Sequence, residues 1–157
     1  MATWQQKQEA SGKLADFLLC KCRDYGELLT PLKLQKLMFY ADAWHMVVKD
    51  AELTPEEFQA WVHGPVALSQ YHRFKEYKWR PITEDIEQPE LDGDTADFLE
   101  DIIDVFGSEP AVALEMMTHQ ERPWIEARRG IPDDEPCNNY ISKVTTKQFY
   151  GEVAEQD

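Results

Sequence analysis

The sequence predicts a mainly α-helical (α+β) fold: a single compact helical domain of about six helices with a small two- or three-stranded β element. Six stretches carry apolar residues at helical spacing, whereas only two short stretches alternate in the manner of strands. A chain of 157 residues with 43% hydrophobic residues can bury a core of its own. No repeat or long linker divides it, so we expect one domain over residues 6–153, with residues 1–5 and 154–157 frayed.

The first two predicted helices cover residues 9–25 and about 31–49. Gly26 ends the first, and Thr30-Pro31 starts the second, with Thr as the N-cap and Pro at the first helical position. The second helix has two apolar sides, one formed by Leu34, Leu37, Met38, Ala41, Trp44 and Val48 and the other by Leu32, Phe39, Ala43 and Met46. Because a helix that is apolar on both sides must be enclosed by neighbours, we expect it at the centre of the fold.

The middle of the chain predicts short elements. Residues 54–57 (Thr-Pro-Glu-Glu) form a capping box that indicates one helical turn, and residues 58–62 alternate as a short strand does. Gly64-Pro65 is expected to end regular structure, and residues 66–77 return to helical spacing. Residues 81–86 are a candidate second strand that would pair with the first around Trp61 and Ile82.

The last third of the chain predicts three further helices and a loop. Helical stripes begin at Thr95 and after Ser108, and a turn at residues 118–124 opens a short helix to Arg129. A proline-containing loop follows, and Ser142 is the expected N-cap of the final helix. We also expect three tryptophans to be largely buried, because each lies on an apolar stripe or in a turn: Trp44, Trp61 and Trp124.

The charge of the chain is strongly acidic. It has a formal net charge of −14, which disfavours nucleic-acid binding by the domain as a whole and favours attraction to basic partners. Residues 84–104 hold ten acidic residues and no Lys or Arg. Such a run is most often a solvated face, and a docking surface is the alternative.

Several features point to the cytoplasm. No apolar run reaches the roughly 18 residues needed to span a bilayer, and the first residues lack the layout of a signal peptide. Cys20, Cys22 and Cys137 show no zinc-ligand spacing and are expected to be reduced thiols. We therefore expect cytoplasmic localisation and no membrane partner.

The sequence carries no pattern of catalytic, metal-binding or cofactor-binding residues. The four histidines, His45, His63, His72 and His119, form no pair at ligand spacing, and no Gly-rich phosphate loop or serine elbow is present. The prediction is a binding protein, not an enzyme, without a cofactor.

One segment departs from the overall acidity. Between Lys33 and Arg80, basic residues interleave with Phe74, Tyr77 and Trp79, a combination that could bind single-stranded nucleic acid or could simply cover a half-buried helix. We expect the partner-binding surface on the exposed side of residues 66–80 and the start of the central helix, with the acidic run at 84–104 as the competing patch. The candidate partner-binding residues are Lys33, Lys36, Tyr71, His72, Phe74, Lys75, Tyr77 and Lys78.

Several phrases, taken in order over residues 12–151, resemble the Panacea domain family, which includes SocA-like and GepA-like phage-associated proteins. They include Leu34-Gln35-Lys36-Leu37, Ala60-Trp61 before Gly64-Pro65-Val66, and Thr118-His119 before Pro123-Trp124. His63 departs from the pattern, since the family more often has an aromatic residue before Gly-Pro. The motif residues expected to have structural roles are Gln35, Tyr40, Trp44, Trp61, Gly64, Pro65, Val66, His119, Pro123 and Trp124.

The resemblance implies an antitoxin of a toxin–antitoxin system. Members of the family are typically encoded beside a toxin and neutralise it by direct binding, whereas SocA-type members resemble adaptors that hand a toxin to a Clp-type protease. The family has no established catalytic residues. The expected partner is therefore a cognate toxin from an adjacent gene, basic in view of the acidity of this chain, with a Clp-type protease as a further partner in the adaptor alternative. A nucleic-acid-binding regulator is the other alternative.

Overall fold

The computed structural model describes residues 1–156 and confirms a mainly α-helical fold with a small β element. The described residues form seven α-helices, one 3₁₀-helix and a two-stranded antiparallel sheet. In chain order these are α1 (Trp4–Asp24), α2 (Pro31–Lys49), β1 (Gln59–Trp61), β2 (Gly64–Val66), α3 (Leu68–Phe74), η1 (Lys75–Tyr77), α4 (Gly93–Phe106), α5 (Ala111–His119), α6 (Arg122–Arg128) and α7 (Lys143–Glu155).

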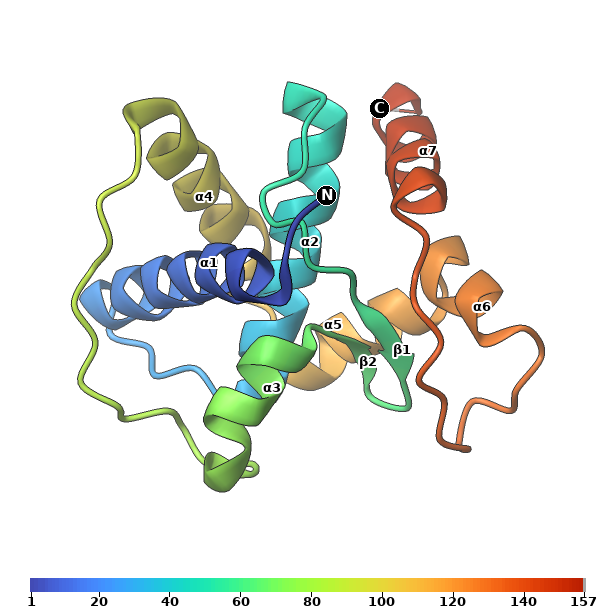
Figure 1. Cartoon of the computed structure of the whole chain (residues 1–157), viewed down its shortest axis with the longest axis horizontal. Coiled ribbons are helices and arrows are strands. Elements are labelled where there is room, and N and C mark those ends of the chain that lie inside the picture. Colours follow the sequence, from blue (N-terminus) through green and yellow to red (C-terminus); the bar gives the residue numbers. More distant parts are fainter. Residues whose placement is uncertain (157) are drawn as a thin grey trace.

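Helix α2 is the central element, as its two apolar sides predicted. It runs through the middle of the molecule in Figure 1 and packs against α1, α4, α5, α7 and β2. All its residues from Lys33 to Ala43 are buried. The predicted start is also confirmed, because Pro31 is the first helical residue and the Thr30 hydroxyl accepts a hydrogen bond from the Lys33 amide at 3.3 Å.

Helix α1 begins earlier than its apolar stripe indicated. Thr3 forms a capping box with Gln6: the Thr3 hydroxyl accepts from the Gln6 amide at 3.1 Å, and the Gln6 side chain accepts from the Thr3 amide at 2.9 Å. The cap starts the helix at Trp4, within the residues expected to be frayed. At the other end α7 extends to Glu155.

The β element is a tight hairpin, and Gly64-Pro65 lies inside it, so the expectation that these residues end regular structure is wrong. Ala60 pairs with Pro65 across the hairpin. The Ala60 amide donates to the Asn139 carbonyl at 2.9 Å, away from β2, so this pair requires no N–H from Pro65. The strand can therefore accommodate a proline.

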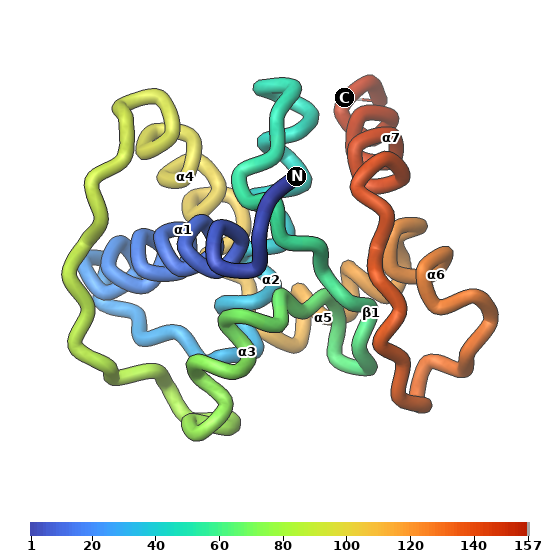
Figure 2. The backbone as a smooth tube through the Cα atoms, viewed as in Figure 1, coloured from blue at the N-terminus to red at the C-terminus, as the bar shows by residue number. Residues whose placement is uncertain are grey.

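The predicted second strand at residues 81–86 is wrong. This stretch belongs to a long irregular connection that follows the outer edge of the molecule between η1 and α4 (Figure 2). Ile82 is buried, and its amide donates to the Leu29 carbonyl at 2.8 Å, which ties the connection to the turn between α1 and α2. The apolar residue that suggested a strand is an anchor for a loop.

The three tryptophans differ in burial. Trp124 is 1% exposed, as expected. Trp44 and Trp61 are also mostly buried, but each keeps an exposed part that Trp124 lacks. Trp44 packs on the rim of the core, and Trp61 stands at the end of β1, where a short strand cannot enclose a large ring on all sides.

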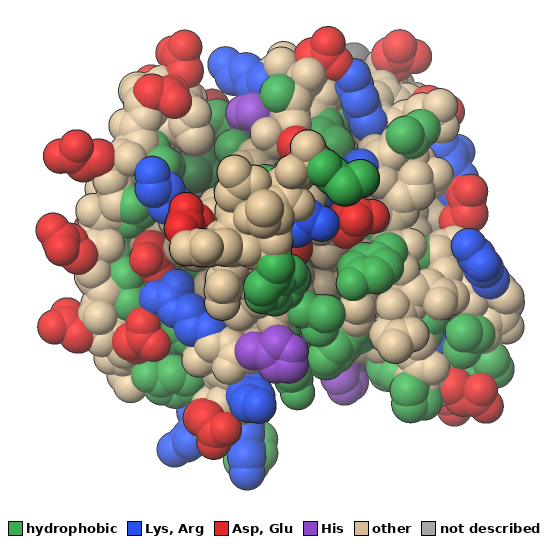
Figure 3. All heavy atoms as spheres, viewed as in Figure 1, with side chains coloured by type: hydrophobic (Ala, Val, Ile, Leu, Met, Phe, Trp, Pro, Cys, Tyr) green, Lys and Arg blue, Asp and Glu red, His purple; other side chains and the backbone are tan. Residues whose placement is uncertain are grey.

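The surface carries its charge unevenly. On the face in Figure 3, acidic side chains line the left and upper edges, and Lys and Arg side chains gather at the lower tip, where α3 ends in Figure 1. Within residues 1–156, no helix has both the length and the apolar character needed to cross a membrane.

Candidate functional site, a lysine-lined cleft beside the hairpin

A cleft of about 830 Å³ opens beside the hairpin. Its walls come from the start of α2, the hairpin, α3 with η1, and the loop between α6 and α7. The volume lies in the range of sites that bind small molecules or anchor side chains. The lining residues are Pro31, Leu32, Gln35, Lys36, Trp61, Val62, His63, Val66, Tyr71, Lys75, Lys78, Ile131, Pro136, Cys137, Asn138 and Asn139.

Buried polar side chains hold the hairpin in place. The Gln35 amide pairs with both backbone groups of Ala67, accepting from its N–H at 2.8 Å and donating to its C=O at 3.1 Å. From α6, the Trp124 indole donates to the Trp61 carbonyl at 2.8 Å, and the Arg128 guanidinium donates to the Ala60 carbonyl at 2.7 Å. These bonds fix β1 to α6 and the end of β2 to α2.

Lys36 lies fully buried at the cleft. Its ammonium makes one hydrogen bond among the described residues, a long one of 3.5 Å to the Pro65 carbonyl, and no ion pair. Burial lowers the pKa of Lys36 from 10.5 to about 7, and the charge of Glu115 opposes this only partly. A lysine with three donors is thus left with little to satisfy them.

The rim of the cleft adds two exposed lysines and two aromatic rings. Lys75 and Lys78 are exposed and form no ion pair within residues 1–156. Lys78 has φ 57° and ψ −116°, a backbone conformation that a side chain makes unfavourable. Beside them Tyr71 packs edge-on against Trp61, with ring centroids 4.7 Å apart.

The structure brings together four of the eight candidate partner-binding residues: Lys36, Tyr71, Lys75 and Lys78 all line the cleft. His72 is exposed but lies outside the lining, and Tyr77 packs partly against the core. Whether any of these residues contacts a partner stays a prediction.

The expected exposure of the remaining candidates is wrong. Lys33 is buried because its ammonium donates to the Gly107 carbonyl and pairs with Glu27, each at 2.5 Å. Phe74 is 1% exposed because it lies on the inward face of α3, against the core. Lys36, which we expected at the surface, is 0% exposed and lies against Gly64 instead.

A family model described as "Antitoxin SocA-like, Panacea domain" matches residues 34–125. The match covers more than half of the chain. This protein belongs to the SocA-like Panacea family. No curated protein and no solved structure matches the chain.

The phrases that carry the resemblance meet at the hairpin of this Panacea domain. Lys36 lies over Gly64, and the Thr118 hydroxyl lies on the same side of that glycine. His119 stacks on Trp124 with centroids 4.0 Å apart, and burial lowers the pKa of His119. Segments far apart in sequence therefore meet at the hairpin.

A buried carboxylate fixes the next part of the Panacea domain. Glu121 accepts hydrogen bonds from the Tyr40 hydroxyl at 2.5 Å and the Tyr150 hydroxyl at 2.9 Å, and Tyr40 stacks on Phe106 at 4.6 Å. Burial raises the pKa of Glu121, and the two hydroxyls oppose this by stabilising the charged form. This cluster joins α2, α6 and α7, so its role is structural.

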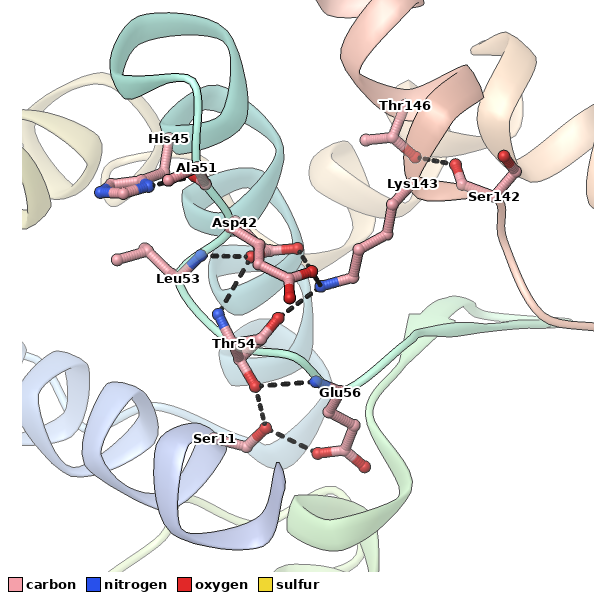
Figure 4. Close-up of polar contacts among 11 residues, drawn as sticks. Ser11, Asp42, His45, Ala51, Leu53, Thr54, Glu56, Ser142, Lys143 and Thr146 are labelled. Atoms are coloured by element: carbon pink, nitrogen blue, oxygen red, sulfur yellow. Dashed lines mark hydrogen bonds and ion pairs between the residues drawn. The ribbon is translucent and has the colours of Figure 1, made fainter. Parts of the chain in front are cut away.

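A second polar cluster holds the segment between α2 and β1 (Figure 4). The Asp42 carboxylate accepts from the Leu53 and Thr54 amides at 2.8 and 3.2 Å and pairs with Lys143 at 3.1 Å. Lys143 also pairs with Glu52 at 3.0 Å. Every charge in this cluster has a partner, unlike the lysines of the cleft.

Glu56 explains why the predicted helical turn at residues 54–57 is wrong. Its carboxylate accepts from the Ser11 and Ser69 hydroxyls, both at 2.6 Å, and from the Ser69 amide at 2.9 Å. Glu56 therefore caps α3 instead of its own turn, because these three donors outweigh one backbone contact (part of this network is drawn in Figure 4).

Sequence reasoning missed the loop side of the cleft. Cys137, Asn138 and Asn139 have no periodic or motif signal, and only the fold brings them to the hairpin, where the Asn139 side chain donates to the Ala127 carbonyl at 3.0 Å. Within residues 1–156 no three His, Cys, Asp or Glu side chains cluster in a way that could hold a metal ion.

Proposed function

We propose that this protein is an antitoxin that neutralises a cognate toxin by direct protein–protein binding, and that the cleft and its rim form the binding surface. The family model supports the antitoxin role. The cleft supports the binding mode, because it combines half-buried aromatic rings with lysines that form no ion pair within residues 1–156. The role is one of binding in the cytoplasm, without catalysis or a cofactor.

The observation that carries this proposal is the contrast between Lys36 and the other buried or partly buried cations of the chain. Lys33 and Lys143 each reach a carboxylate, and Arg128 reaches three carbonyl groups. Lys36 reaches one distant carbonyl. A partner that enters the cleft can pair with Lys75 and Lys78, which are exposed at its rim and form no ion pair within residues 1–156.

The partner is a toxin encoded by an adjacent gene and basic overall. The net charge of −14 attracts basic proteins, and the acidic residues of α4 and the connection before it lie at the surface. Such steering raises the rate of encounter, whereas the buried contacts of the cleft govern how long the complex lasts.

Co-expression with the product of the adjacent gene tests the proposal. Wild-type protein should restore growth to cells that express this toxin, and the pair should co-purify. The double variant Lys75→Glu/Lys78→Glu should weaken rescue, whereas Asp97→Asn/Asp101→Asn, which changes two exposed acidic residues outside the cleft, should keep it. Rescue lost only by the second variant would move the interface to the acidic face.

The same assay separates the alternative mechanisms. Rescue that persists in cells without Clp proteases supports direct inhibition, and rescue that requires a Clp protease would assign an adaptor role. Filter binding at low salt tests the nucleic-acid-binding regulator. Retention of RNA or DNA that depends on Lys75 and Lys78 would favour that regulator over the antitoxin.

A further inference from the structure

Two lysines of the cleft are each held in an unfavourable state. Lys36 is fully buried with one hydrogen bond of 3.5 Å. Lys78 has a positive φ in a region that suits glycine better than any residue with a side chain. Residues that lower stability in this way concentrate at functional sites, and these two line the same cleft.

The lining of the cleft has a single sign of charge. Lys36, Lys75 and Lys78 line it, and no Asp or Glu does, in a chain with 30 acidic residues. None of the three lysines forms an ion pair within residues 1–156. The cleft is therefore complementary to an anionic group, although the protein as a whole is complementary to basic partners.

The other lining groups are mainly apolar. Leu32, Val62, Val66 and Ile131 offer aliphatic surface, and the Trp61 and Tyr71 rings offer aromatic surface. The two rings pack edge-on at an interplanar angle of 63°, so a nucleobase cannot insert in parallel between them. The exposed Asn138 amide can donate to and accept from a peptide backbone.

We propose that the cleft binds a peptide segment of the partner protein in which a carboxylate side chain lies next to aliphatic or aromatic residues. This deepens the proposed function by naming the chemistry that the cleft recognises in the toxin. The carboxylate faces Lys75 and Lys78, the two exposed lysines of the cleft, and the apolar side chains cover Trp61 and Tyr71. A toxin that is basic overall needs only one such segment.

Selection from a random-peptide phage library on the immobilised full-length protein tests the proposal. The enriched peptides should carry Asp or Glu beside a large apolar residue. Synthetic versions should bind wild type at least tenfold more tightly than they bind Lys75→Glu/Lys78→Glu. Lys13→Glu is the matched control, because Lys13 is exposed on α1 outside the cleft, and it should bind as wild type does.

A second arm changes the peptide in place of the protein. Replacing its acidic residue by Gln should weaken binding to wild type about tenfold and should not weaken binding to Lys75→Glu/Lys78→Glu, as expected for groups that act on each other. This arm remains informative if a protein variant fails to fold, which circular dichroism would reveal.

Three results would overturn the proposal: no enriched peptide, enriched peptides without an acidic residue, or equal binding to Lys75→Glu/Lys78→Glu and wild type. Binding of a fluorescein-labelled single-stranded oligonucleotide that depends on Lys75 and Lys78 would assign the cleft to nucleic acid instead. Failure here leaves the antitoxin proposal standing if wild type still rescues cells from the toxin. Peptide binding without any rescue would support the cleft as a peptide-binding site and would contradict the antitoxin role.

Discussion

The side chain of Lys36 passes directly over the α-carbon of Gly64. A β-carbon at residue 64 would lie 2.3 Å from Lys36 Cε and 3.1 Å from Lys36 Nζ, and Gly64 has φ +110°. Glycine is therefore required at this position both by the backbone and by the lysine above it. This contact explains why the segment Leu34-Gln35-Lys36-Leu37 packs against the segment Gly64-Pro65-Val66, although the two are far apart in the sequence.

Gly64→Ala should lower the free energy of unfolding by roughly 2–4 kcal/mol, because it adds a clash to backbone strain. Denaturant unfolding measures the loss. The clash is with the flexible side chain of Lys36. The double variant Gly64→Ala/Lys36→Ala should therefore recover part of the lost stability, while the strain at φ +110° remains. If the effects of the two substitutions on the free energy of unfolding simply added in the double variant, Lys36 would not press on residue 64.

Lys36→Met should raise the free energy of unfolding at pH 7 and below, on the order of 1–4 kcal/mol, because it removes a buried, poorly satisfied cation and keeps most of the volume. The pH dependence has a defined sign. The unfolded chain holds the Lys36 proton up to a pKa of 10.5, and the folded protein releases it near a pKa of about 7. The destabilisation by Lys36 should therefore shrink as pH rises from 7 towards 10.

Comparison of wild type with Lys36→Met at each pH isolates this effect from the titration of other groups. A variant less stable than wild type throughout the range would show that Lys36 is a structural residue. It would also show that Lys36 is not held in an unfavourable state.

Tyr150→Phe should lower the free energy of unfolding by about 1–3 kcal/mol at pH 8, because a hydroxyl that donates to the buried Glu121 carboxylate at 2.9 Å is lost. Burial raises the pKa of Glu121, so the carboxyl gains its proton as pH falls towards its ordinary pKa of 4.5. The effect of Tyr150→Phe should shrink over that range, because the hydrogen bond that the Tyr150 hydroxyl makes to a neutral carboxyl group is weaker than the one it makes to a charged carboxylate. Thermal unfolding of wild type and Tyr150→Phe at pH 8 and near pH 4.5 measures the loss of stability at each pH. Equal losses at the two pH values would contradict a charged Glu121 at pH 8.

Trp124→Ala and Trp61→Ala should separate stability from binding. Trp124 is fully enclosed and bonded to the Trp61 carbonyl, so its truncation should lower the free energy of unfolding by about 3–5 kcal/mol. Trp61 is half-buried at the cleft, so its truncation should lower stability less and weaken rescue from the toxin more. Calorimetry measures the stability of the two variants, and the rescue assay measures their function. A larger loss of stability for Trp61→Ala than for Trp124→Ala would place Trp61 in the core.

Local signals in the sequence were sufficient for most of the helices. The caps at Thr30 and Ser142 lie where their residue types predicted, since an N-cap depends on a few neighbouring residues. The two-sided apolar pattern placed α2 at the centre correctly. The hairpin was harder, because Pro65 suits β2 only through the outward hydrogen bond of Ala60 to Asn139, a residue far away in the chain.

The cleft could be predicted only in part. Tyr71, Lys75 and Lys78 were accessible to pattern reasoning because they share one amphipathic segment. The burial of Lys36 was not, since charge alone argues for exposure, and only the approach of Gly64 creates its position. The loop wall depends on contacts between α6 and residues 132–139 that no local pattern encodes.

The buried Arg128 guanidinium donates to the Ala60 carbonyl at 2.7 Å, to the Pro132 carbonyl at 2.6 Å and to the Glu135 carbonyl, so one side chain spans the hairpin and the opposite loop. All three acceptors are backbone atoms, and any residue can provide them. The loop side chains can therefore be exchanged while the opening keeps its width. A domain built in this way can acquire a new partner through changes at positions such as Ile131 and Asn138 and leave its frame untouched.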